Sequence, residues 1–187
     1  MFKNRRNLII LISAVLLILA ALFYFGVIKL PKPNVPLLQY SNPFFGISLK
    51  YPEGWAVDTN GGAFAGIPLR FAGNTGYFGI NASASADDKA SIDEVLSAEE
   101  GRISYGTTPT IESGTIDGRE FRIVIPSKDQ PSESKNQALA LIRYPEKIKI
   151  GDFFFRYLII YSDSAHIKDI ISSLKFLTPV TSSSSAK

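Results

Sequence analysis

The sequence contains no cysteine and only one histidine, His166. Without cysteine the chain has no disulfide framework, no thiolate metal site, no thiol nucleophile and no cysteine for lipid attachment. A typical transition-metal site needs several imidazole or thiolate ligands, and His166 has no second histidine or cysteine to join it. The sequence therefore predicts no metal site and no cofactor, although the lone histidine leaves metal binding open.

A basic surface for nucleic acid is also missing, although the pI is near 9.0. Between Tyr40 and Thr178 the chain carries 14 of its 20 basic residues and all 17 acidic ones, so this part is formally −3. No stripe of basic and aromatic residues runs through it, and nucleic-acid binding is therefore not expected. The high pI comes from basic residues near the two ends of the chain: Lys3, Arg5, Arg6, Lys29, Lys32 and Lys187.

The longest uncharged run predicts a membrane anchor over residues 8–30. No residue from Leu8 to Ile28 is charged, and at ~1.5 Å per residue these 21 positions extend ~31 Å, about the hydrocarbon thickness of a bilayer. The alternative is a cleaved signal peptide, whose apolar core is usually about 7–15 residues long. Here Ala20 and Ala21 are followed by more apolar residues where a cleavage site should open, which favours an uncleaved transmembrane helix.

Flanking charges predict the orientation of this anchor, and prolines predict a spacer after it. Segment 1–7 carries three basic residues and two lie just after the apolar run, which favours a cytoplasmic N-terminus. Prolines in segment 31–37 cannot continue a helix and predict a stiff spacer. Segment 180–187 is rich in serine and is predicted to be disordered. We therefore expect a single-pass protein of the cytoplasmic membrane with one domain, over residues 38–179, outside the membrane.

Alternation of apolar and polar residues predicts mainly β-strands in this domain. Residues 153–161 are apolar on both faces except at Arg156, which is typical of a central strand covered on both sides. Turns containing Asp117-Gly118 and Gly151-Asp152 predict two hairpins. The expected strands are 45–51, 55–57, 68–72, 77–84, 110–113, 119–125, 137–144 and 153–161.

Two helices are predicted beside these strands. Ser91 and Glu94 form a capping box, which predicts the start of a helix that ends near Arg102. The second helix, whose cap is expected at Asp163 or Ser164, is predicted by apolar residues at helical spacing. They are Ile167, Ile170, Ile171 and Leu174. The domain therefore reads as an α+β fold, most simply one antiparallel β-sheet covered by helices.

Two motifs at opposite ends of the domain resemble those of PsbP-like domains. The first runs from Tyr40 through Phe45-Gly46 to Tyr51-Pro52-Glu53-Gly54-Trp55, and the second is Ser173-Leu174-Lys175-Phe176, in which Leu174 replaces the usual aromatic residue. The resemblance implies an α/β/α sandwich around an antiparallel sheet. Named family members are extrinsic subunits and assembly factors of photosystem II, with bacterial relatives of unknown role. An uncleaved anchor departs from the lumenal plant proteins.

No set of residues predicts catalysis. His166 has Asp163 and Asp169 nearby, but an exposed histidine in the first turn of a helix is the simpler interpretation. Ser132 and Lys135 match the S-x-x-K motif of penicillin-binding enzymes without its companion motifs, which favours a surface loop. Three acidic pairs are expected on solvated surfaces: Asp87-Asp88, Asp93-Glu94 and Glu99-Glu100. We therefore predict that the protein is not an enzyme.

The glycine-rich segment 61–66 is the one candidate binding loop. Gly61, Gly62, Phe64 and Gly66 are the residues expected to contact a ligand, and no Lys-Ser/Thr comes after them to form a phosphate cradle. The anchor, the spacer and the missing catalytic set predict a non-catalytic binding, scaffolding or assembly-accessory domain. Its expected partner is a protein of the membrane or cell envelope. The alternative is a domain that binds a small ligand with this loop and the aromatic residues of the sheet.

Overall fold

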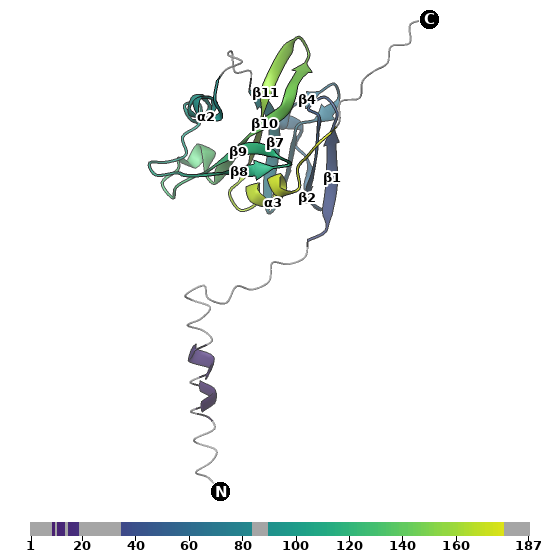
Figure 1. Cartoon of the computed structure of the whole chain (residues 1–187). Coiled ribbons are helices and arrows are strands. Elements are labelled where there is room, and N and C mark those ends of the chain that lie inside the picture. Colours follow the sequence, from purple (N-terminus) through teal and green to yellow (C-terminus); the bar gives the residue numbers. More distant parts are fainter. Residues whose placement is uncertain (1–8, 10, 14, 19–34, 84–89, 178–187) are drawn as a thin grey trace, which may run out of the picture. The chain divides into compact units, whose positions relative to one another are not determined.

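The computed structural model describes residues 9, 11–13, 15–18, 35–83 and 90–177 (Figure 1). Contacts divide the chain into two units, Met1–Val35 and Pro36–Lys187. In the first unit the described residues between Ile9 and Ile18 are helical and exposed. No helix formed by the described residues is long and apolar enough to cross a membrane. Most of the predicted anchor 8–30, all of segment 1–7 and the predicted tail 180–187 lie outside the described residues.

The second unit is built around a seven-stranded antiparallel sheet, the main sheet, in the order β3-β6-β7-β11-β10-β9-β8. The central strand β11 buries Leu158 and Ile160 on one face and Tyr157 and Ile159 on the other, as its apolar sequence predicted. The strands are β3 (Ala56–Val57), β6 (Arg70–Gly73), β7 (Gly76–Ser83), β8 (Thr110–Ile116), β9 (Arg119–Ile125), β10 (Gln137–Ile150) and β11 (Phe153–Asp163).

A second sheet has three strands, in the order β1-β2-β12, so the prediction of a single sheet is wrong. Its strands are β1 (Leu37–Asn42), β2 (Ile47–Pro52) and β12 (Lys175–Phe176). The turn after β2 contains Gly54, whose φ of 94° suits glycine. β2 buries Ile47 and Leu49 in one apolar cluster with residues of the main sheet instead of pairing within that sheet. The predicted antiparallel, mainly β architecture with few helices is confirmed.

The first predicted helix is confirmed as α2 (Ile92–Glu100). Its capping box forms as expected, because the Ser91 side chain accepts from the backbone N–H of Glu94 and the Glu94 carboxylate accepts from the backbone N–H of Ser91, with an N···O distance of 2.7 Å. Val95 and Leu96 pack with Tyr157 of the main sheet in one apolar cluster. α2 therefore covers one face of the sheet.

The second predicted helix is α3 (Ile167–Ser172), which buries Ile167, Ile170 and Ile171 in the larger apolar cluster. The predicted cap is wrong: His166 is the N-cap residue, without a side-chain cap, since the Asp163 carboxylate accepts from the N–H of Ala165 at 3.1 Å. The short elements are η1 (Thr59–Gly61), β4 (Ala63–Phe64), β5 (Ile67–Pro68) and η2 (Ser132–Ser134).

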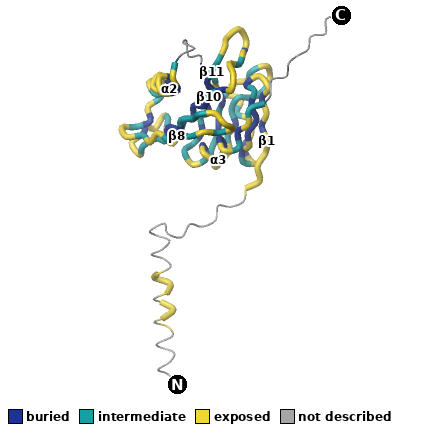
Figure 2. Tube along the Cα trace, in the orientation of Figure 1, coloured by how far each residue is buried: buried dark blue, intermediate teal, exposed yellow. Residues whose placement is uncertain are grey.

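The buried apolar residues therefore lie in two clusters on opposite faces of the main sheet. Figure 2 marks the buried positions along the chain in dark blue. One cluster joins the sheet to α2. The other joins it to α3 and the three-stranded sheet, and is rich in aromatic rings. Because alternate residues of a strand point to opposite faces, this layering decides which side chains of the main sheet are covered and which remain open.

A carboxylate outside the core fixes two loops together. The side chain of Asp129 accepts hydrogen bonds from Ser127 Oγ, from Thr107 Oγ1 at 2.6 Å and from Thr107 N at 3.1 Å. These donors, Ser127 first, lower the pKa of Asp129 to about 2. The loop contact should therefore be intact above the ordinary pKa of 3.8 and be lost as the pH falls through 2.

Replacing Thr107 by valine should raise the pKa of Asp129 toward its ordinary value, because valine keeps the shape but removes one donor. A carbon-detected NMR titration of the Asp129 carboxyl measures this shift. Thr110→Val, an exposed position outside the contact, is the control. An unchanged Asp129 pKa in Thr107→Val would show that the hydrogen bond contributes nothing.

Candidate functional site

The face of the main sheet that carries α2 also carries a cleft of about 360 Å³. α2 packs over β9, β10 and β11, whereas the neighbouring strands β6 and β7 contribute half of the lining residues. The polar side chains that line the cleft are Arg70, Tyr77, Asn81, Gln137 and Tyr161. Gly79 lies among them, and we call this hollow the Gly79 cleft.

The register of the sheet explains why the hollow lies at Gly79. Phe78 and Ile80 point into the aromatic core, so strand alternation turns Gly79 toward the α2 side. Gly79 pairs with Arg70 on β6 and with Tyr161 on β11. The row Arg70–Gly79–Tyr161 thus has no side chain at its centre. A β carbon built at Gly79 has its nearest atoms, in Arg70 and Leu69, at 3.8 Å, so it would make ordinary van der Waals contact without a clash.

Polar groups converge on this hollow. The hydroxyl of Tyr77 donates to Gln137 Oε1 at 3.2 Å. The guanidinium of Arg70 lies 4.8 Å from the centre of the Tyr77 ring, and Arg70 Nε lies 3.2 Å from Asp58 Oδ2. Asn81 Oδ1 accepts from the N–H of Ala82 at 2.8 Å. These contacts hold the side chains at the rim in place.

Tyrosine hydroxyls stay neutral around the cleft. Burial is the main cause that raises the pKa of Tyr77, to about 12. Burial also raises the pKa of Tyr161, and the nearby Glu99 adds to the effect. Tyr105, which is 3% exposed, has its pKa raised by burial and then by Tyr161 and Tyr77. At ordinary pH all three phenols therefore keep their protons and can donate hydrogen bonds.

A buried carboxylate lies next to these tyrosines. Glu99, at the end of α2, accepts from Ser83 Oγ at 3.0 Å and pairs with Arg102 at 3.3 Å. Its side chain is almost completely buried, so the expected solvated surface is wrong for Glu99, whereas Asp93 and Glu94 are exposed as expected. The two partners explain how a carboxylate can be tolerated there. The pair Asp87-Asp88 lies outside the described residues.

The glycine-rich loop is only partly at the cleft. Gly61 is among the lining residues, whereas Gly62, Phe64 and Gly66 are not. Gly62 has a φ of 77°, and Gly66, at 79°, forms the tight turn between β4 and β5. Phe64 packs its ring against Phe44, with 5.4 Å between the ring centres. The binding role of the whole loop stays a prediction. A glycine inside a strand was the overlooked signal, because it often marks a close approach to the backbone.

The side chain of His166 is held by contacts within the fold. The expectation of an exposed side chain is wrong, because it is 24% exposed, with Nδ1 2.7 Å from Asp163 Oδ1 and its ring centre 5.1 Å from that of Trp55. The other Asp163 oxygen accepts from the backbone N–H of Tyr77 at 3.1 Å. Among the described residues, no serine or threonine hydroxyl bonds to the His166 ring, so the nucleophile that a hydrolase needs is not in place there.

The remaining candidates lie on the surface or apart from one another. Ser132 and Lys135 are exposed, Ser132 within η2 and Lys135 just after it, as expected for a surface loop. Within residues 35–83, 90–177 and the described part of the first unit, no group of three or more histidine, aspartate or glutamate side chains could hold a metal ion. The site that the described residues do build is a cleft lined by hydrogen-bonding groups, among which Arg70 is the one charged side chain.

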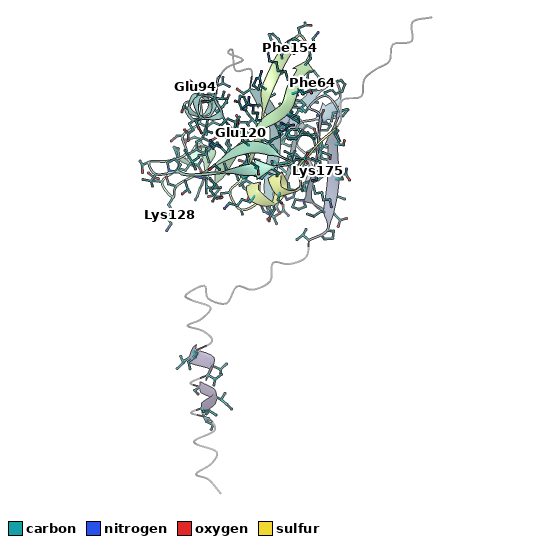
Figure 3. The ribbon with its side chains drawn as sticks, viewed as in Figure 1. Phe64, Glu94, Glu120, Lys128, Phe154 and Lys175 are labelled. Atoms are coloured by element: carbon teal, nitrogen blue, oxygen red, sulfur yellow. The ribbon has the colours of Figure 1, made fainter. Side chains whose placement is uncertain are left out.

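A second feature is the far part of the β10–β11 hairpin, residues 144–155, which we call the distal hairpin. β9 pairs with β10 only from Leu139 to Ile142, and β7 pairs with β11 only from Tyr157 to Ser162. The register between β10 and β11 shifts between Arg143 and Ile148. After this shift, the described strands of the distal hairpin pair only with each other. Phe153 and Phe154 at its tip are 68% and 62% exposed. Figure 3 labels Phe154 on this hairpin.

Comparison with known proteins gives a likeness to a solved structure. No model of a protein family matches the chain. No curated protein matches it either. Among solved structures, the chain is similar to the solution structure of cyanobacterial PsbP (CyanoP) from Synechocystis sp. PCC 6803, with 14% sequence identity and a TM-score of 0.41. The similarity covers 81% of this chain and 99% of that chain.

Proposed function

We propose that this chain is a membrane-tethered, extracytoplasmic and non-catalytic binding module that docks on a protein of the membrane or cell envelope. The observation that carries the proposal is the pair of exposed phenylalanines at the tip of the distal hairpin. Aromatic side chains dominate the buried centres of protein interfaces, and two adjacent ones in water are unfavourable unless a partner covers them.

The position of the distal hairpin supports a protein partner. Leu37 pairs with Pro52 at one end of the three-stranded sheet, and Ile47 pairs with Phe176 at the other. Phe176 lies 5.6 Å, between ring centres, from Tyr144, where the distal hairpin begins. The hairpin therefore projects from the end of the domain remote from Leu37 (Figure 1). The exposed tip of the distal hairpin therefore lies at the opposite end of the domain from the residue that follows the predicted spacer, and it is the part of the domain that we expect a protein partner to cover.

Further aromatic surface lies at the same end. Phe44, in the turn between β1 and β2, is exposed and packs edge-on against Phe64. Exposed apolar patches of this kind mark interaction sites. The membrane tether rests on the apolar run of residues 8–30, and an accessory role rests on the PsbP-like motifs at Tyr51–Trp55 and Ser173–Phe176. A non-catalytic role is supported by the structural environment of His166.

Photocrosslinking tests the docking proposal. A benzoylphenylalanine at position 154 of the full-length protein, in its native membrane, should give a reproducible crosslink to one protein. The double variant Phe153→Ser/Phe154→Ser should reduce co-purification of that protein by about 30-fold or more, because losing even one interface hot spot costs ~2 kcal/mol or more.

The matched control is Leu37→Ser/Ile111→Ser, which removes two exposed apolar side chains away from the distal hairpin. It should retain the partner. Crosslinks to lipid alone would contradict the proposal, as would equal loss of the partner in both double variants.

A further inference from the structure

We infer that the Gly79 cleft binds a neutral pyranose sugar, either free or at the end of a glycan. This inference is independent of the docking proposal, since the cleft and the distal hairpin share no residue. It gives the small-ligand alternative a defined site and a ligand class.

The shape of the cleft fits one sugar ring. The floor is strand backbone at Gly79, and Tyr77 and Tyr161 beside it supply apolar ring surface. A pyranose has a flat face of C–H groups that can pack on such a floor while its hydroxyls reach the rim. The volume of about 360 Å³ corresponds to roughly a dozen waters at ~30 Å³ each, about the number of non-hydrogen atoms in a hexose.

Hydrogen-bond donors predominate at the cleft. The Tyr161 hydroxyl and the amide nitrogen of Asn81 have no protein partner among the described residues, and both line the cleft. Sugar hydroxyl and ring oxygens accept hydrogen bonds from such groups, and the hydroxyls can donate in return. The side chains of Tyr77 and Gln137, which also line the cleft, are held in place by the hydrogen bond between them.

The charged residues around the cleft favour a neutral ligand. Arg70 is the cation that lines the cleft, and it already lies 3.2 Å from Asp58. Behind the cleft, Glu99 is paired with Arg102. An anion would therefore meet an arginine whose charge is already balanced by Asp58, and a buried carboxylate nearby. A neutral polyol pays a much smaller desolvation cost on entering the cleft.

The decisive variant is Gly79→Val. The nearest atoms to a new β carbon are at 3.8 Å, so the fold can accept the side chain, and a β-branched residue suits a strand better than glycine. The valine fills the floor and should weaken sugar binding at least tenfold while the melting temperature stays equal or rises. Thr115→Val, on the exposed edge strand β8, is the matched control and should bind normally.

Saturation-transfer NMR on the full-length protein, in a detergent without sugar headgroups, provides the readout. The probes are glucose, N-acetylglucosamine, maltotriose and chitotriose, with glucuronate as the charged counterpart. At least one neutral sugar should bind with a Kd on the order of 1 mM, as expected for a small open site. Stronger binding of a trisaccharide assigns a glycan end, and equal binding assigns a free sugar; either supports the inference.

Three results would overturn it: no transfer to any neutral sugar, equal transfer from wild type and Gly79→Val, or a preference for glucuronate over glucose. If Gly79→Val does not fold, Tyr161→Phe replaces it. That change removes one hydroxyl and should weaken sugar binding severalfold. Undiminished sugar binding by Tyr161→Phe would also contradict the inference.

Discussion

Replacing Phe78 by alanine should lower the free energy of unfolding by about 3–5 kcal/mol, the usual cost of deleting a buried aromatic ring. Phe78 is fully buried and stacks on Phe71 with 5.1 Å between ring centres. Tyr40 and Tyr51, from the three-stranded sheet, pack on it at 5.8 and 5.5 Å. The ring therefore joins the two sheets, and its loss leaves a cavity between layers that cannot easily close.

Denaturant unfolding of the full chain in detergent measures this effect. Phe154→Ala removes the same ring from an exposed position and should change the free energy of unfolding by less than about 0.5 kcal/mol. A loss below about 1 kcal/mol in Phe78→Ala would mean that the two sheets do not depend on this ring.

Replacing Asp163 by alanine should cost about 2–4 kcal/mol of stability, because several groups lose their partner at once. Its carboxylate accepts from the backbone N–H of Tyr77 and of Ala165 and lies 2.7 Å from His166 Nδ1. These bonds tie the start of β7 to the start of α3. The Asp163 carboxylate also lies directly against the Gly76 backbone, where a β carbon would clash with it.

Thermal unfolding of Asp163→Ala and Asp163→Asn separates the contributions. Asparagine keeps one acceptor and should recover part of the stability, while Asp152→Ala, at an exposed turn, should have little effect. If Asp163→Ala is as stable as the wild type, the cluster around His166 is not structural. The histidine would then again be a candidate for catalysis.

The elements of the domain followed largely from local patterns. The capping box at Ser91 produced α2, and the apolar residues 153–161 produced a central strand, because both signals are short-range. The predicted cap of α3 was wrong because the Asp163 carboxylate accepts from Ala165 and also from Tyr77, a residue 86 positions away. The second sheet was missed for the same reason, since β12 is two residues long and exists only through its pairing with β2.

The sequence by itself determined the alternation that puts Tyr77, Gly79 and Asn81 on one face of β7. Its lack of cysteine also excluded thiolate sites. Tertiary structure alone decided that this face would be a site. Arg70 and Tyr161 reach Gly79 only through pairing between β6, β7 and β11, and the hollow stays open because α2 packs over the neighbouring strands. Such long-range pairing depends on the packing of the whole core, which no local window of sequence contains.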